Sequence, residues 1–145
     1  PGHRDVLSCS KEDLDYYCDF IQRKERSFRE LVAEPADHFI DLFWARLLPY
    51  LTVISAGETL EYRLLLRNNL SQAATYEARL VAPRGWETSS EMARLKLEPG
   101  GRGELRLVAT APHQADKVRR LMTAEISIDG KSQGHVSEAL VTVKN

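Results

Sequence analysis

The sequence predicts a mainly β protein: an antiparallel β-sandwich of seven or eight strands over residues 49–145, preceded by a two-helix extension over residues 1–48. Two observations favour this arrangement, one for the sandwich and one for the helical extension. Over residues 59–143 apolar and polar residues alternate in short runs, and Gly, Pro or Asn interrupts these runs about every 8–12 residues. In the first third of the chain, apolar residues instead recur at steps of three and four, which is typical of helices.

The first predicted helix covers roughly residues 11–33. Ser10 provides a hydroxyl cap, and Glu12 and Asp13 place negative charge at the positive end of the helix dipole. Pro35 then prevents the helix from continuing. The apolar positions that define one face are Leu14, Tyr17, Cys18, Ile21, Phe28, Leu31 and Val32.

A second, shorter helix is predicted between Asp37, which can cap it, and Pro49, which ends it. Its apolar residues lie nearly all round: Phe39, Ile40, Leu42, Phe43, Trp44, Leu47 and Leu48. A short helix of this kind must be covered by the first helix, by the sandwich or by another domain. Phe43 and Trp44 are therefore candidate interface residues. The sequence does not decide whether the helices pack on their own sandwich or on a neighbouring subunit.

The predicted strands follow one another with turn residues between them. Pro99-Gly100-Gly101 marks one turn, and Asp129-Gly130 predicts a tight hairpin turn with positive backbone φ. The strands are expected at residues 50–54, 60–66 and 75–82, around Trp86, around Leu95 and Leu97, and at residues 105–109, 122–128 and 136–143.

Charge and composition exclude some classes of protein. Residues 1–48 carry 7 Lys and Arg against 10 Asp and Glu, and residues 49–145 carry 13 against 11, so neither part has the basic excess of a nucleic-acid-binding protein. No apolar run approaches the length of a membrane span. Cys9 and Cys18 form no CxxC motif and do not require an oxidising environment. The compartment stays open, with the cytoplasm slightly favoured.

Four motifs in the sandwich region carry a resemblance: Ser55-Ala56-Gly57-Glu58, Asn68-Asn69, Ala82-Pro83-Arg84-Gly85-Trp86 and Leu97-Glu98-Pro99-Gly100-Gly101. In order and spacing they resemble the Ig-like accessory domains found beside α-galactosidase-type and other hydrolase domains. The resemblance implies a fibronectin-like sandwich that serves as a structural or interaction unit rather than an enzyme.

The first 48 residues carry a second resemblance. Pro1-Gly2-His3, the basic helix around Gln22-Arg23-Lys24-Glu25-Arg26 and the apolar segment up to Leu48 are similar to the tail of metallo-β-lactamase-fold hydrolases of the glyoxalase II type. The resemblance implies that His3 is one ligand of a zinc or other divalent metal site, whose other ligands lie upstream in a longer parent protein. The HxHxDH signature is absent here, so we expect no cofactor to be held by these residues alone.

The sequence offers no catalytic constellation, since it has neither a GxSxG elbow nor a phosphate-binding loop. We therefore expect a non-catalytic module that positions, stabilises or oligomerises an upstream metal-dependent hydrolase domain. Its expected partners are that catalytic domain of the same chain and further copies of itself, with no nucleic acid and no membrane. The alternative is a module that binds carbohydrate or a cell-surface polymer through Trp86, whose ring could stack on a sugar or instead plug one end of the core.

Overall fold

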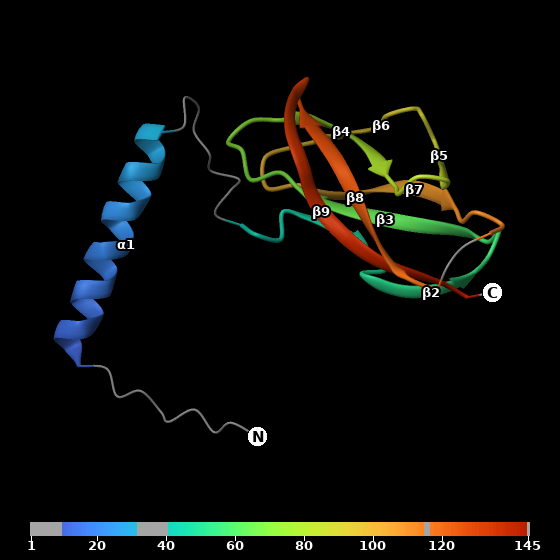
Figure 1. Cartoon of the computed structure of the whole chain (residues 1–145). Coiled ribbons are helices and arrows are strands. Elements are labelled where there is room, and N and C mark those ends of the chain that lie inside the picture. Colours follow the sequence, from blue (N-terminus) through green and yellow to red (C-terminus); the bar gives the residue numbers. More distant parts are fainter. Residues whose placement is uncertain (1–9, 32–40, 115–116, 145) are drawn as a thin grey trace. The chain divides into compact units, whose positions relative to one another are not determined.

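The computed structural model describes residues 10–31, 41–114 and 117–144. The chain divides into two compact units, Pro1–Ala36 and Asp37–Asn145. In the described residues the first unit contains one helix, α1 (Lys11–Leu31), and the second contains nine strands (Figure 1). A mainly β protein with an N-terminal helix is therefore confirmed.

Helix α1 begins with the cap that the sequence predicts. The Asp13 backbone N–H donates to Ser10 Oγ at 3.1 Å, and the Ser10 N–H donates to Asp13 Oδ2 at 3.0 Å. This reciprocal pair satisfies two donors that a helix start leaves open, with Asp13 in the place that Glu or Gln usually takes. The hydroxyl and the N–H of Ser10 both stabilise the charged carboxylate, so they hold the pKa of Asp13 below its usual value.

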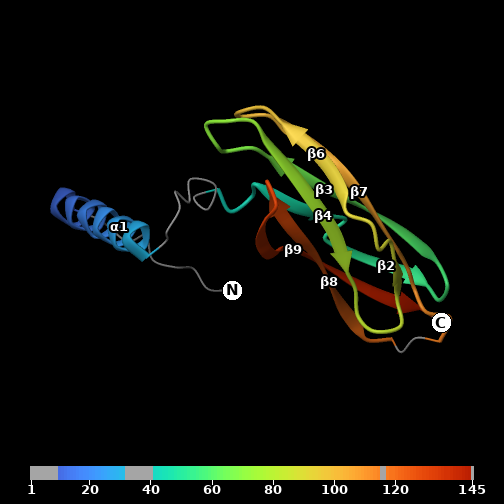
Figure 2. The same cartoon turned by 90° about the horizontal axis from the view of Figure 1, so that it is seen from above.

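The nine strands form two sheets (Figures 1 and 2). The first sheet has the order β1 (Ala45–Leu48), β3 (Thr59–Arg67), β7 (Arg102–Thr110) and β5 (Glu87–Thr88). The second has the order β2 (Leu51–Ser55), β9 (Lys131–Lys144), β8 (Arg119–Ile128), β4 (Ala74–Val81) and β6 (Ala93–Leu97). The count is nine rather than seven or eight because β1 lies in a segment predicted as helix, whereas β5, of two residues, follows directly on Trp86, where a strand is expected.

One hydrophobic core lies between the two sheets. Successive residues of a strand point to opposite faces, so alternate residues are buried along β3 and β8, and along β9 from Ala139 onward. The side chains with almost no exposure come from both sheets: Tyr62 and Leu64 in the first, and Tyr76, Met122, Ile126, Val141 and Val143 in the second. The predicted turn at Asp129-Gly130 is also present, with φ of 48° and 77°.

The second predicted helix is wrong for the residues that the structure describes. Residues 41–44 form a turn, and Ala45–Leu48 is strand β1, which pairs antiparallel with β3 from Ala45↔Leu66 to Leu48↔Arg63. The apolar run suggested a helix buried on all sides, but Ala45 and Leu47 point into the core and Arg46 points out. Pairing with β3, which is distant in sequence, outweighs the local pattern. Residues 41–48 thus belong to the sandwich, and the boundary expected after Leu48 moves upstream.

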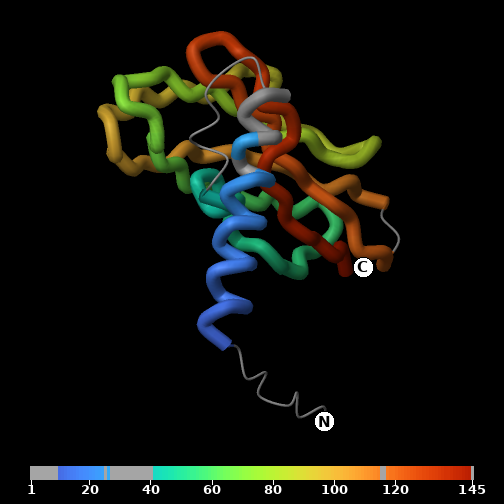
Figure 3. The backbone as a smooth tube through the Cα atoms, turned by 90° about the vertical axis from the view of Figure 1, so that its left-hand side faces the viewer, coloured from blue at the N-terminus to red at the C-terminus, as the bar shows by residue number. Residues whose placement is uncertain are grey.

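The sandwich is also not purely antiparallel. After β1 the chain passes from the first sheet to the second without reversing direction, and β2 pairs parallel with β9 from Leu51↔Leu140 to Ser55↔Lys144. Figure 3 shows the red C-terminal strand, β9, running beside β2. Parallel pairing arises because β2 joins the sheet through a crossover rather than a hairpin.

A buried asparagine ties together the loops that follow β3. Asn68 has no exposed surface. Its Nδ2 donates to the carbonyl oxygens of Gln72 (2.8 Å) and Leu97 (3.0 Å). Its Oδ1 accepts from the Leu70 N–H and the Tyr76 hydroxyl, both at 3.0 Å. Every polar atom of this side chain is thus used, as burial requires.

The buried hydroxyl of Tyr62 has no hydrogen-bond partner among the residues that the structure describes. Burial raises the pKa of Tyr62 to about 12. We expect Tyr62→Phe to increase the free energy of unfolding by up to about 1 kcal/mol, because an unpaired polar group is removed from the core. Tyr76→Phe is the matched control, since it breaks the bond to Asn68 and should destabilise by a similar amount. Urea denaturation of both variants checks this, and a destabilised Tyr62→Phe would contradict it.

The effect of Tyr62→Phe on the free energy of unfolding should depend on pH. The unfolded chain ionises its tyrosines near pH 10, whereas folded Tyr62 does so only at about 12. The wild-type protein should therefore lose stability as the pH rises from about 10 to 12, by about 1.4 kcal/mol per pH unit for each such tyrosine. Tyr62→Phe should lose less over this range.

Candidate functional site: an arginine groove and two smaller hollows

The described residues contain no group of three or more His, Cys, Asp or Glu side chains that could hold a metal ion. His3, the ligand implied by resemblance, lies outside the described residues. In the described part of the chain, no helix combines the length and the hydropathy of a membrane span. The candidate sites are therefore hollows on the sandwich.

One of them is a groove of about 500 Å³ on the outer face of the first sheet, which we call the arginine groove. The turn before β1 contributes two residues, and β1, β3 and β7 supply the others. The lining residues are Asp41, Phe43, Arg46, Leu65, Leu66, Arg67, Arg102, Gly103 and Glu104. Cross-strand pairing explains the gathering of charge, because Arg67 lies opposite Arg102, and Leu65 lies between Arg46 and Glu104.

Both acidic side chains of the groove, Asp41 and Glu104, form hydrogen bonds and ion pairs with other residues of the sandwich. Asp41 accepts from Asn69 Nδ2 (3.2 Å) and the Phe43 N–H (3.0 Å) and pairs with Arg67 (3.4 Å). These bonds, led by the one from Asn69, hold the pKa of Asp41 below its usual value. Glu104 accepts from Nε (3.1 Å) and Nη2 (2.7 Å) of Arg63, which lowers its pKa as well.

Arg46 and Arg102 form no ion pair with any residue that the structure describes. An arginine fork binds carboxylates and phosphates well. The groove can therefore receive an anionic group, with Phe43 and Leu65 as apolar contacts.

The two predicted interface residues, Phe43 and Trp44, lie in opposite environments, one exposed and one buried. Phe43 is 72% exposed and lines the arginine groove. Trp44 is 3% exposed, and its ring centroid lies 6.1 Å from that of Tyr76 in the second sheet. Trp44 as an interface or ligand residue is thus wrong, because its indole fills the core between the two sheets.

Trp86 packs against the core and lines a hollow of about 360 Å³ with Pro83, Arg84, Pro112, Gln114, Arg120 and Val143. It follows the turn at Pro83-Arg84-Gly85, where its N–H donates to the Pro83 carbonyl oxygen at 3.3 Å. The ring is partly buried, as expected of a residue that plugs one end of the sandwich. Sugar binding at Trp86 stays a prediction.

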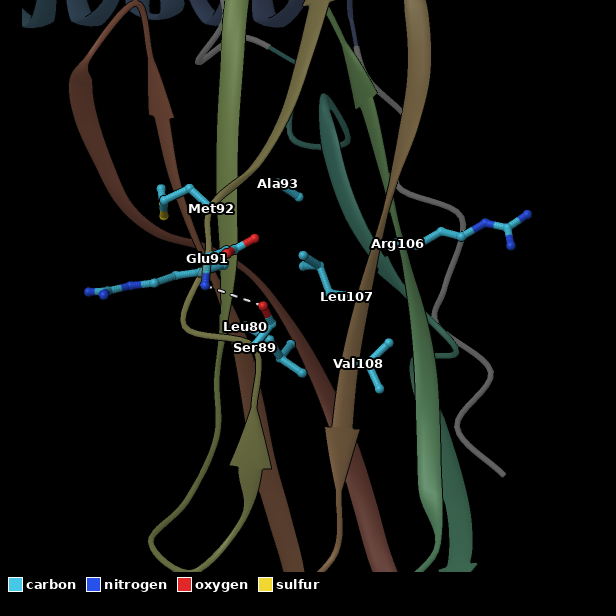
Figure 4. A pocket seen from close by; sticks show the side chains of 9 residues that line it. Leu80, Ser89, Glu91, Met92, Ala93, Arg106, Leu107 and Val108 are labelled. Atoms are coloured by element: carbon cyan, nitrogen blue, oxygen red, sulfur yellow. Dashed lines mark hydrogen bonds between the residues drawn. The ribbon is translucent and has the colours of Figure 1, made fainter.

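A third hollow, of about 310 Å³, opens between β6 and β7, where the edges of the two sheets separate (Figure 4). Leu107 and Ala93 point into it, whereas Arg106 extends to the other side of β7 (Figure 4). Arg79 also lines it but pairs with Glu125 at 2.6 Å. Its lining is mixed, with Leu80 and Met92 beside Ser89 and Glu91, and we interpret it as a gap at the edge of the core.

Sequence patterns did not point to Arg46, Arg102 or Leu65. The alternation in β3 and β7 places each residue on an outer face, but their gathering depends on strand order and register. The adjacent polar pair Asn68-Asn69 was the one nearby signal, and Asn69 does orient Asp41 at the rim of the groove.

Comparison with known proteins bears on the fold. No family model matches the chain, and no curated protein matches its sequence. Among solved structures, a part of Escherichia coli α2-macroglobulin in its native conformation superposes with a TM-score of 0.54 at 21% identity, over 69% of this chain. This chain spans 6% of that protein's length.

Two further structures align with lower scores. A non-cellulosomal cohesin from Archaeoglobus fulgidus has a TM-score of 0.43 at 12% identity, covering 70% of this chain and 90% of that one. The apo-form Calx CBD1 domain has 0.42 at 19% identity, covering 69% and 98%. At 21% identity the likeness to the α2-macroglobulin segment concerns the fold alone, and the chain carries an Ig-like β-sandwich.

Proposed function

We propose that the chain is a non-catalytic interaction module that positions or stabilises an upstream metal-dependent hydrolase domain. The observation that carries the proposal is the exposed apolar face of α1. Leu14, Tyr17 and Ile21 lie at helical spacing on one side of α1, and each is more than half exposed. Cys18, on the same side, is an exposed free thiol.

We expect an exposed apolar face of this kind to pack against a partner. Burial of a large apolar side chain contributes about 1.5–3 kcal/mol, and most helices in proteins depend on this packing rather than on their own propensity. An upstream domain that covered α1 would gain this stabilisation and would be tied to the sandwich. In the resemblance to metallo-β-lactamase-fold hydrolases, the same domain would supply the metal ligands that accompany His3.

Two measurements test the proposal. Calorimetric titration of zinc into this chain should give no stoichiometric tight site, because the described residues hold no ligand cluster. In the intact protein, the double substitution Leu14→Glu with Ile21→Glu should lower the melting temperature of the hydrolase domain. Arg26→Glu, which puts the same acidic side chain on the polar face of α1, should leave it unchanged. A tight zinc site, or equal melting temperatures for the two variants, would contradict the proposal.

The alternative function is carbohydrate binding at Trp86. The ring lines a hollow together with Arg84, Gln114 and Arg120, which could donate hydrogen bonds to hydroxyl groups. Glycan-array binding that disappears in Trp86→Ala, with an unchanged circular dichroism spectrum, would favour this function over the first.

A further inference from the structure

Three leucines form a row across the outer face of the second sheet. Leu51 on β2 lies opposite Leu140 on β9, and Leu140 lies opposite Leu121 on β8. Leu51 is 56% exposed and Leu121 is 49% exposed. Val53, 49% exposed, lies in the next row on the same face. We call Leu51, Leu140 and Leu121 the leucine row; the three strands that carry it lie side by side in Figure 1.

Opposite charges lie on the two sides of the leucine row. On one side, two residues along β9, is Glu138, opposite Thr123. On the other side, two residues along β8, is Arg119, opposite Thr142. Both charged side chains are exposed, and neither forms an ion pair with another described residue. The surface is thus acidic, apolar and basic in succession along the strand direction.

This succession is self-complementary. If a second copy is turned by 180° about an axis that runs along the leucine row, the two rows meet and the strand directions are reversed. Glu138 of each copy then faces the side of the row that carries Arg119 of the other, one strand away and within reach of an arginine side chain. A two-fold axis along the strands would instead set like charges against each other.

We propose that the sandwich forms a two-fold symmetric dimer with a second copy of this chain, face to face through the leucine row. Sheets packed face to face interdigitate their side chains at about 10 Å, so the leucines of both copies would leave water together. The inference rests on the interaction role proposed above and names the sandwich's partner. It involves the sandwich alone, and an upstream domain on α1 is not needed for it.

The apolar part of this surface is small, and small interfaces are weak or transient. The dimer should therefore depend on concentration. Sedimentation equilibrium of the full chain, over a range from micromolar to hundreds of micromolar, measures the dissociation constant. We expect Leu121→Glu to weaken dimerisation at least about tenfold, because a charge would be buried without a partner.

Charge reversal gives the sharper test. Glu138→Arg and Arg119→Glu should each weaken the dimer, and the two together should restore it to within about threefold of the wild type, since the pair is re-formed with its signs exchanged. Two acidic controls should leave the constant unchanged: Leu65→Glu on the other sheet and Ile21→Glu on α1. Circular dichroism melts confirm that each variant is folded.

A wild-type chain that stays monomeric up to hundreds of micromolar would overturn the dimer and leave the proposed role of α1 intact. Dissociation by Ile21→Glu rather than Leu121→Glu would also overturn it, because association would then occur through the helix. The proposal would likewise be overturned if the dimer of the charge-exchanged double variant were no tighter than the dimers of the two single variants.

Discussion

Trp44→Ala is expected to lower the free energy of unfolding by about 3–5 kcal/mol. The indole is 3% exposed and contacts the ring of Tyr76, so truncation would leave a cavity between the two sheets. A domain of this size is typically stable by about 5–15 kcal/mol, so much of its stability would be lost. Urea denaturation followed by tryptophan fluorescence from Trp86 and by circular dichroism measures the change.

Phe43→Ala is the matched control. It removes an aromatic ring from the neighbouring position, but that ring is 72% exposed, so the free energy of unfolding should change by less than about 0.5 kcal/mol. Similar losses for the two variants would mean that residues 41–48 do not enter the core as strand β1 and its preceding turn, and would favour the helical arrangement.

Asn68→Ala should lower the free energy of unfolding by a comparable amount, about 3–5 kcal/mol, for a different reason. The substitution leaves four buried or partly buried groups without their partner: the carbonyl oxygens of Gln72 and Leu97, the Leu70 N–H and the Tyr76 hydroxyl. Each orphaned group costs about 1–3 kcal/mol, reduced where water can enter. Chemical denaturation gives the value.

Two further variants test whether the loss of stability comes from the hydrogen bonds of Asn68 itself. Asn68→Asp keeps Oδ1 but loses both donations from Nδ2, so it should also destabilise strongly at neutral pH. Asn69→Ala removes a neighbouring amide whose partner, Asp41, is only partly buried, and should cost less than about 1 kcal/mol. Little destabilisation in Asn68→Ala would show that this side chain does not hold the loops after β3.

The predicted elements succeeded where one local rule was sufficient. Helix α1 follows from the Ser10 cap and its apolar spacing, and the β8–β9 hairpin from the alternation around Asp129-Gly130. The run from Leu42 to Leu48 failed because a short buried strand and a short buried helix are both apolar, and periodicity over so few residues does not separate them. In the structure, pairing of Ala45 with Leu66 decides between them.

The candidate sites were less accessible to prediction. Phe43 and Trp44 are chemically alike and adjacent, yet one lines the arginine groove and the other fills the core. Arg46 and Arg102, or Leu51 and Leu121, lie more than 50 residues apart in the chain, and each set is brought to one face by strand order. No pattern within a single strand contains that information.

The sequence by itself determined that the chain is mainly β, that an amphipathic helix precedes the strands and where most strands lie, because these properties depend on residues a few positions apart. The tertiary structure alone decided which sheet each strand joins, that β2 runs parallel to β9, and which exposed residues gather into the arginine groove and the leucine row. Those outcomes depend on contacts between distant segments, where the gain from burying both sheets together outweighs local preference.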